Sequence, residues 1–277
     1  MSGKLFIVAT PIGNLKDITL RALEILESVD WIACEDTRHS KKLLQHFGIS
    51  KPLISLHDHN EQTKKTELLA KLQAGEKGAL VSDAGTPLIS DPGYHLVSYL
   101  RENGLSVEPI PGPSAVITAL SAAGMPTDRF TFEGFLPAKE QKRLTALEVL
   151  SAETRTMVFY ESPHRLMESL KSMRVVFGEE RQIAVAKEIT KQFERFVFGS
   201  IPQVIEQFES NEDWQRGEFV IMVSGVEEKD SQQEDYDDLV KVLLTQSLHV
   251  KQISEIVGEF YNVPKKAVYQ RVLTLKS

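Results

Sequence analysis

Short apolar runs alternate with amphipathic segments in the first part of this chain, and that alternation allows few folds. The apolar runs have the length and composition of buried strands and lie at residues 4–9, 31–34, 53–56, 78–81 and 105–107. The segments between them carry apolar residues at helical spacing, over residues 17–28 (with Asp17 as N-cap), 41–47 and 63–72. A helix between two strands returns the chain to the same edge of a sheet, so the strands pair in parallel. We therefore predict an α/β fold with a mainly parallel sheet covered by helices on both faces.

Two turns dense in proline and glycine follow strands of this predicted sheet. They are Ser-Asp-Ala-Gly-Thr-Pro-Leu-Ile-Ser-Asp-Pro-Gly at residues 82–93 and Pro-Ile-Pro-Gly-Pro-Ser-Ala at residues 109–115. Glycine has no Cβ, so the backbone can approach a ligand there, and ligands of open α/β sheets bind at the carboxyl ends of strands. Neither turn matches a P-loop or a dinucleotide-binding fingerprint. The pair indicates a small-molecule cleft, with ordinary strand-to-helix turn chemistry as the alternative.

The pattern changes at about Arg129, where strands become more frequent than helices. Predicted strands lie at residues 130–135, 156–160, 182–187, 193–198 and 218–224, and helices at 138–150 and 164–177. We predict an N-terminal α/β domain at 1–124, a mixed α/β domain with some antiparallel pairing at 125–226, an acidic linker at 227–238 and three short helices within 239–277. The last segment is either a helix-turn-helix-like RNA-binding module or a helical cap that packs on a partner subunit.

Composition restricts the compartment and the kind of partner. The chain has 42% hydrophobic residues, no apolar run near the roughly 20 residues that span a bilayer, and no signal peptide at its start, so we expect a cytoplasmic protein without a membrane partner. Its only cysteine, Cys34, lies in an apolar run and is predicted to be a buried strand thiol. The formal net charge of −7 means that any nucleic-acid binding must depend on local basic patches.

Two segments are locally basic, and one pair of histidines raises the question of a metal. Arg38, His39, Lys41 and Lys42 form a short basic stretch suited to RNA phosphates, after a helix start capped by Asp36 or Thr37. Residues 248–277 carry more basic than acidic side chains: Lys251, Lys265, Lys266, Arg271 and Lys276 against Glu255 and Glu259. His57 and His59 share one face of an extended segment, but no cysteine or further histidine stands at zinc-like spacing, so we predict no metal site.

Five motifs follow one another in a fixed order along the chain. They are Ala-Thr-Pro-Ile-Gly-Asn-Leu at 9–15, Cys-Glu-Asp-Thr-Arg at 34–38, the Val81–Gly93 turn, Phe-Tyr-Glu-Ser-Pro-His-Arg at 159–165 and Lys-Glu-Ile-Thr-Lys at 187–191. Together they resemble the tetrapyrrole methylase superfamily of S-adenosylmethionine-dependent methyltransferases. The chain is most similar to the branch that 2′-O-methylates a cytidine ribose in the decoding region of small-subunit (16S) rRNA. The resemblance implies two α/β domains with S-adenosylmethionine in the cleft between them, a homodimer, and the small ribosomal subunit as partner.

The resemblance also implies which residues bind the cofactor. Carried onto this chain, the contacts are Ile12, Ala84, Gly85, Thr86, Ile89, Ser114, Ala115, Glu161 and Ile189. The sequence departs from the tetrapyrrole-modifying branch, because its first loop lacks Gly-x-Gly-Pro-Gly-Asp, Thr86 replaces an aspartate, and Glu161 stands where methionine is common. These departures and the basic terminal module argue against the alternative of a corrin or tetrapyrrole methylase. A third reading is a non-catalytic RNA-binding protein on the same fold.

A ribose hydroxyl is a poor nucleophile, so the expected reaction benefits from a base and from a cation near the developing alkoxide. On the family pattern, the candidate catalytic residues are Glu161, Glu188 and Lys191. The candidate RNA contacts are Arg38, His39, Lys41, Lys42, Arg165, Lys187, Lys265, Lys266 and Arg271. Each of these charged residues, taken singly, also suits an exposed face with surface salt bridges.

Overall fold

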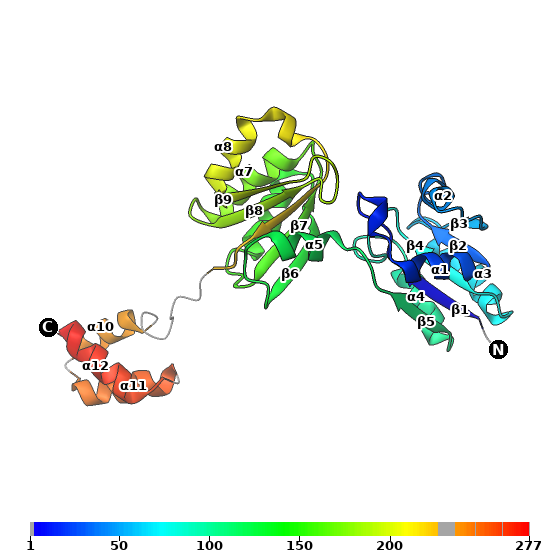
Figure 1. The fold of residues 1–277 in the computed structure, drawn as a ribbon. Coiled ribbons are helices and arrows are strands. Elements are labelled where there is room, and N and C mark those ends of the chain that lie inside the picture. The colour runs from blue at the N-terminus through cyan, green and yellow to red at the C-terminus, as the bar shows by residue number, and fades with distance from the viewer. Residues whose placement is uncertain (1–2, 227–235, 247, 262, 277) are drawn as a thin grey trace. The chain divides into compact units, whose positions relative to one another are not determined.

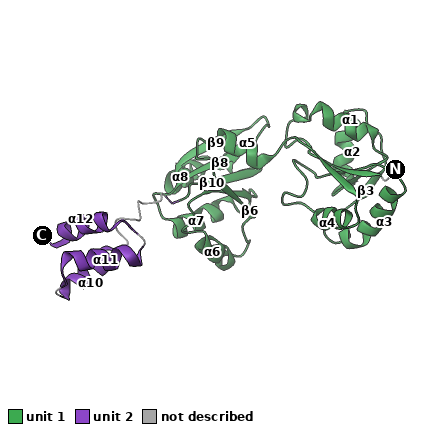
Figure 2. Ribbon diagram, turned by 90° about the horizontal axis from the view of Figure 1, so that it is seen from below, with its two compact units in different colours: residues 1–225 green, residues 226–277 purple. Residues whose placement is uncertain are grey.

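The computed structural model describes residues 3–226, 236–246, 248–261 and 263–276 of the chain. The chain divides into two units, residues 1–225 and 226–277, each with a buried apolar core of its own (Figure 2). The first unit holds two five-stranded sheets, and the second holds three helices. Of the linker predicted at 227–238, residues 227–235 lie outside the described residues, whereas Asp237 and Asp238 begin a helix and correct that boundary.

The first sheet is wholly parallel, as the alternation of strands and helices predicts (Figure 1). Its strands are β1 (Lys4–Val8), β2 (Trp31–Cys34), β3 (Leu53–Ser55), β4 (Gly78–Val81) and β5 (Ser106–Ile110), in the order β3-β2-β4-β1-β5. Helices α1 (Leu20–Ser28) and α2 (Thr37–His46) pack on one face, and α3 (Glu61–Gln73) and α4 (Tyr94–Glu102) on the other. Alternate strand residues such as Leu5 and Phe6 enter opposite cores, because successive strand side chains point to opposite faces.

The second sheet is mostly antiparallel. Its strands are β6 (Phe130–Phe135), β7 (Thr156–Glu161), β8 (Gln182–Lys187), β9 (Arg195–Ser200) and β10 (Phe219–Val223), in the order β6-β7-β10-β8-β9. Only β6 and β7 pair in parallel within this sheet. Helices α6 (Glu140–Val149), α7 (Leu166–Phe177) and α8 (Ile201–Glu209) cover one face.

Helix α5 (Ala115–Ala122) covers the other face of the second sheet, although it follows β5 of the first (Figure 1). Its Val116, Ala119 and Leu120 pack with residues of β7, β8 and β10. The same apolar cluster includes Ile12, from the loop after β1. The predicted end of the N-terminal domain at residue 124 therefore lies after α5, although α5 packs in the core of the second sheet.

Several element boundaries differ from the sequence predictions. Helix α1 begins at Leu20, after a short 3-10 turn η1 (Leu15–Asp17). Its N-cap is Thr19, whose Oγ1 accepts a hydrogen bond from the Ala22 N–H at 3.1 Å. The predicted N-cap, Asp17, is therefore wrong. Pro109 belongs to β5 and not to a turn, which an edge strand tolerates because one side of its backbone is unpaired. Helix α2 begins at Thr37 with Asp36 as cap, four residues earlier than predicted. Strand β9 lies two residues later than predicted.

Sequence reasoning missed α8 and the 3-10 turn η2 (Glu212–Gln215). Helix α8 begins with a capping box of Ser200 and Gln203 and has proline in its first turn. That capping-box pattern is visible in the sequence and could have revealed the helix.

The second unit consists of α10 (Asp237–Thr245), α11 (Val250–Phe260) and α12 (Lys265–Lys276). They bury Tyr236, Val240, Ile253, Val257, Val268 and Val272. Gly258 permits close packing of α11 on the following turn, because a Cβ there would lie 2.8 Å from Lys265 Cγ. Within the described residues, every helix is too short or too polar to cross a membrane.

Candidate active site

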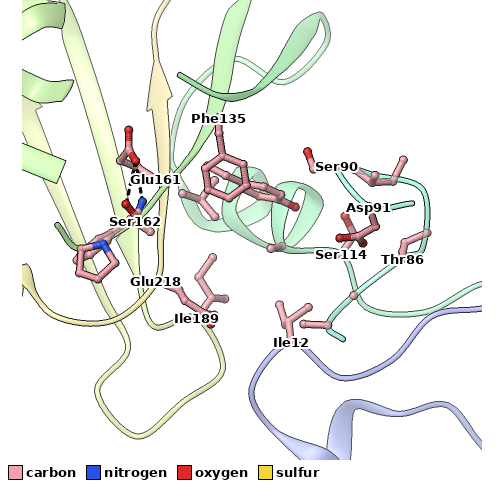
Figure 3. A pocket seen from close by; sticks show the side chains of 18 residues that line it. Ile12, Thr86, Ser90, Asp91, Ser114, Phe135, Glu161, Ser162, Ile189 and Glu218 are labelled. Carbon is pink, nitrogen blue, oxygen red and sulfur yellow. Dashed lines mark hydrogen bonds between the residues drawn. The ribbon is translucent and has the colours of Figure 1, made fainter. Parts of the chain in front are cut away.

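A cavity of about 340 Å³ lies in the first unit, between the loops at the ends of the two sheets (Figure 3). All nine side chains predicted to bind the cofactor line it: Ile12, Ala84, Gly85, Thr86, Ile89, Ser114, Ala115, Glu161 and Ile189. Sequence reasoning missed several further lining residues, among them Ser90, Asp91, Phe135, Tyr160, Ser162 and Glu218. Ser90 and Asp91 stand inside the glycine-rich turn, so the turn itself was the signal for them. Phe135 and Glu218 come from distant parts of the sequence, and no sequence signal identified them as lining residues.

The turn after β4 is held in a strained conformation that faces the cavity. Gly85 has φ +81° and pairs with Thr10 through backbone hydrogen bonds of 2.8 and 3.1 Å. Leu88 and Ser90, at φ +72° and +69°, occupy the left-handed region that non-glycine residues rarely adopt. Such strain persists only where the surrounding structure imposes it, and it clusters at ligand sites. Thr86 Oγ1 donates to the Pro113 carbonyl at 2.9 Å and so ties this turn to the second one.

The loop after β8 closes the cavity from the second sheet. Ile189 is buried on the cavity wall between Glu188 and Thr190, which have φ +50° and +67°. The Asn14 N–H donates to Thr190 Oγ1 at 3.1 Å, and a Cβ at Gly13 would lie 2.5 Å from Lys191 Cγ. The first loop therefore needs glycine at position 13 to contact the loop that carries Ile189 and Lys191.

The carboxylate of Glu161 is engaged in a buried network and is not free to act as a base. Its Oε1 accepts from the Ser162 N–H at 2.7 Å and pairs with the Arg165 guanidinium at 2.8 Å, and its Oε2 accepts from the Ser169 hydroxyl at 2.6 Å. The side chain is 1% exposed, and Figure 3 shows the carboxylate turned to Ser162 and away from the cavity. Glu161 therefore shapes the cavity wall, which corrects its predicted role as proton acceptor.

All three guanidinium nitrogens of Arg165 are engaged in the same network, which competes with its predicted contact with RNA. Besides the Glu161 pair, its Nε donates to Ser162 Oγ at 3.1 Å and its Nη1 donates to the Leu136 carbonyl at 3.1 Å. These bonds fix the Ser162–Pro163 segment of the cavity wall between β7 and α7.

Glu188 and Lys191 form an ion pair beside the cavity. The Lys191 ammonium lies 2.9 Å from Glu188 Oε1 and 2.9 Å from Glu218 Oε2. Burial acts to raise the pKa of Glu188, but the Lys191 ammonium and the Glu218 N–H hold the pKa below its usual range. A carboxylate with a lowered pKa is a weak base, and Glu188 lies outside the set of residues lining the cavity, which corrects its predicted role. Burial acts to lower the pKa of Lys191, but its two carboxylate partners raise it, so it remains a cation.

A second cavity of about 300 Å³ adjoins the first and shares Ile12, Ala84 and Glu218 with it. Its other lining residues include His39 and Lys42 of α2, with Asp83 and Lys191. The predicted basic stretch is thereby divided between two sides of α2. Arg38 and Lys41 line a separate hollow with Lys51, and Arg38 forms an ion pair with Asp36 at 2.9 Å. Only His39 and Lys42 of the predicted stretch face the space next to the candidate active site.

The four other predicted RNA contacts differ in their environment. Lys187 is only 7% exposed, which does not favour its predicted contact with RNA. Arg271 is corrected: its Nε donates to Asp237 Oδ1 at 3.0 Å, so it joins α12 to α10. Lys265 and Lys266 are exposed at the start of α12, where a phosphate could approach them.

Two titratable groups in the main cavity have strongly shifted pKa values. Burial, then the negative charges of Glu35 and Asp83, raises the pKa of Asp91 to about 6, with the Ser82 hydroxyl acting in the opposite direction. Burial and the charge of Asp91 raise the pKa of Tyr160 to about 12. Among the described residues, no group of three or more histidine, cysteine and carboxylate side chains is arranged to hold a metal ion. The His57 ring lies 6.0 Å from the His59 ring, and its Nε2 is 3.2 Å from the Asn60 side-chain amide.

The residues around the main cavity fit the predicted cofactor. Ile12, Ile89, Ile189 and Val220 supply apolar walls for an adenosyl group, and Thr86, Ser90 and Ser114 supply hydroxyls at its edge. The volume lies in the range usual for small-molecule sites. A carboxylate, Asp91, also lines this cavity and would suit the cationic groups of the cofactor.

Comparisons with known proteins agree with this arrangement. The family described as Tetrapyrrole (Corrin/Porphyrin) Methylases matches residues 4–205, and the RsmI C-terminal HTH domain matches residues 230–276. The chain is 52% identical over 274 residues to "Ribosomal RNA small subunit methyltransferase I" of Escherichia coli O157:H7, which covers 98% of this chain and 95% of that relative. It is 50% identical over 272 residues to the protein of the same name from Haemophilus influenzae, covering 98% and 96%.

Solved structures share the fold at low sequence identity. Diphthine synthase superposes with a TM-score of 0.61 at 14% identity, covering 80% of this chain and 90% of that structure. Uroporphyrin-III C-methyltransferase from Thermus thermophilus, in complex with S-adenyl homocysteine, gives a TM-score of 0.54 at 17% identity, covering 80% and 97%.

Proposed function

Because this chain belongs to the ribosomal RNA small subunit methyltransferase I family of tetrapyrrole methylases, we propose that it 2′-O-methylates a cytidine ribose in the decoding region of 16S rRNA. The chain is a methyltransferase that uses S-adenosylmethionine. The observation that carries the proposal is the single cavity on which all nine cofactor-binding candidates meet. The choice of a cytidine 2′-hydroxyl as the methylated group depends only on the resemblance of the five sequence motifs to this family.

The residues of the cavity would position two reactants in a space that excludes water. When bound, S-adenosylmethionine supplies an electrophilic methyl group. Ile12 and Ile189 close the cavity from opposite loops, and both are buried. Holding two reactants in one dry, ordered space supplies much of the acceleration of such a transfer.

The second cavity is where we place the target nucleotide. It shares a wall with the main cavity, and Lys42, His39 and Lys191 give it cations that suit an RNA backbone. Lys191 remains protonated, so it also suits the stabilisation of charge that develops on the ribose oxygen.

Reversing the charge of Lys42 should reduce methylation of rRNA much more than reversing the charge of Lys41. The two lysines are neighbours and both are exposed, but only Lys42 lines the cavity beside the active site. We expect Lys42→Glu to lower kcat/KM for rRNA by about 10–100-fold, since it loses a phosphate contact and adds repulsion. Lys41→Glu has the same change in net charge and should cost only a few-fold. Equal losses for the two variants, measured at one salt concentration, would remove the second cavity from the RNA path.

We propose that the C-terminal unit adds backbone contacts to rRNA through Lys265 and Lys266. The unit has its own apolar core, so a chain ending at residue 225 should keep the first unit folded. We expect this truncation to weaken RNA binding by about 10–100-fold and to reduce its salt dependence, with the affinity for S-adenosylhomocysteine unchanged. Unchanged RNA affinity would assign the unit to packing or assembly.

We also propose a homodimer that acts in the cytoplasm on the small ribosomal subunit. Several large apolar side chains of the first unit are more than half exposed, among them Leu20, Ile117 and Phe193. Exposed apolar side chains are typical of surfaces that bind another protein chain. The molecular mass of the chain in solution tests the dimer.

Methyl transfer from radiolabelled S-adenosylmethionine tests the proposed function directly. The acceptors are small subunits and naked 16S rRNA that lack modification, and the labelled nucleotide is mapped afterwards. We expect label on one ribose of the decoding region. Label on a base, or on no RNA in any assembly state while S-adenosylhomocysteine still binds, would contradict the proposal.

A further inference from the structure

We infer that Asp91 accepts the proton of the attacking 2′-hydroxyl and is therefore a catalytic residue; this inference rests on the proposed function. Three carboxylates line the main cavity: Asp91, Glu161 and Glu218. The Glu161 oxygens are engaged by Ser162, Ser169 and Arg165. Glu218 pairs with Lys191 and is 76% exposed. Within the described part of the chain, Asp91 alone of the three makes no ion pair.

The backbone around Asp91 presents it to the cavity. Ser90, immediately before it, and Leu88 both hold left-handed φ values, and Gly93 follows at φ +126°. Figure 3 shows the Asp91 carboxylate beside Ser114 at the edge of the cavity, opposite the wall formed by Glu161 and Ser162. The strained segment thus carries a carboxylate to the wall of the main cavity, which adjoins the second cavity.

The groups around Asp91 make it a stronger base than an ordinary aspartate. Glu35 follows β2, Asp83 follows β4, and both repel a charge on Asp91, while the Ser82 hydroxyl stabilises it. From the second sheet Tyr160 faces it and remains neutral. A base whose pKa is close to the working pH is the most effective proton acceptor, because it is ionised and still binds the proton well.

The step balances in atoms and charge. The ribose 2′-oxygen gains the methyl carbon, and the electron pair of the broken carbon–sulfur bond stays on sulfur, which becomes a neutral thioether. The hydroxyl proton passes to an Asp91 oxygen and then to water. Beyond S-adenosylmethionine and the RNA, the atoms and electrons of this step require no oxidant or further substrate.

Asp91→Asn tests the inference, with the wild-type chain measured alongside. We expect kcat to fall by about 100-fold or more, the usual contribution of a positioned base, with unchanged affinity for S-adenosylhomocysteine measured by calorimetry. The wild-type rate should rise with pH through about pH 6, and this limb should be absent from the residual activity of the variant. Glu35→Gln is the matched variant: burial is the main cause of the raised pKa of Asp91, and this variant removes one of the two charges that add to it, so the limb should move part of the way to lower pH while a substantial rate remains at pH 8.

Thermal unfolding gives a readout that does not depend on turnover. The raised pKa of Asp91 means that its ionised form disfavours the folded state above about pH 6. Asp91→Asn should therefore melt at a higher temperature than wild type at pH 8, and the difference should disappear as the pH falls below about 4, the ordinary pKa of aspartate.

The other outcomes overturn the inference in distinguishable ways. Loss of S-adenosylhomocysteine binding in Asp91→Asn would make Asp91 an anchor for the cofactor's cationic groups. A variant with wild-type kcat would exclude proton transfer to Asp91. A wild-type chain that binds the cofactor but methylates no rRNA would overturn the proposed function, and the inference with it.

Discussion

Arg165→Ala should destabilise the first unit by about 3 kcal/mol, the usual cost of leaving a buried charge without its partner. The Glu161 side chain is 1% exposed, and Arg165 is the cation that pairs with it. The variant also loses the hydrogen bonds that Arg165 donates to Ser162 Oγ and to the Leu136 carbonyl. Thermal unfolding should show a decrease in Tm of roughly 6–12 °C for a unit of this size.

Lys171→Ala is the matched control, since Lys171 lies on the same helix α7 and forms an ion pair with Glu209 at 3.0 Å. Both of those side chains are more than half exposed, so we expect a change within about 1 kcal/mol. If Arg165→Ala unfolds like Lys171→Ala, the Glu161 network is not a stabilising element, and Glu161 returns as a candidate proton acceptor.

Gly85→Leu should abolish cofactor binding without unfolding the chain. A Cβ at position 85 would lie 3.3 Å from Ile12 Cγ2 and 3.8 Å from the Pro113 carbonyl, so the rest of the side chain would extend into the main cavity. The left-handed backbone at φ +81° adds about 1–2 kcal/mol of strain. We expect the affinity for S-adenosylhomocysteine to fall by at least about 100-fold, equivalent to about 2.8 kcal/mol.

Gly48→Leu is the control that distinguishes backbone strain from obstruction of the main cavity. Gly48 has φ +71°, and no atom lies within 4 Å of a Cβ built on it. The variant therefore carries a similar backbone penalty at a site far in sequence from the cavity residues. We expect a comparable decrease in Tm for the two variants and a loss of cofactor affinity only for Gly85→Leu. Normal binding by a folded Gly85→Leu chain would show that the cavity is not the cofactor site.

The polar residues that were assigned roles from their motifs show where sequence reasoning ends. Glu161 and Glu188 stand at strand ends in recognisable motifs, so their positions near the cavity could be predicted. Whether a carboxylate faces the cavity or a buried network depends on the rotamer and on partners such as Ser169 and Lys191. A motif contains no such information, and the structure does not favour either proposed base, because both carboxylates are engaged by other groups. Asp91 is in the most conspicuous turn of the chain, yet only its burial in the folded chain and the charges of Glu35 and Asp83 distinguish it from other aspartates.

The sequence by itself determined the α/β fold, the parallel first sheet and the position of the two proline- and glycine-rich turns that line the main cavity. Apolar periodicity, glycine and proline act over a few residues, so these features can be read locally. The tertiary structure decided how α5 crosses to the second sheet, which side of α2 faces the active site, and which charged groups are paired. Burial and ion pairing depend on atoms that are distant in the chain, and only the folded structure brings those atoms together.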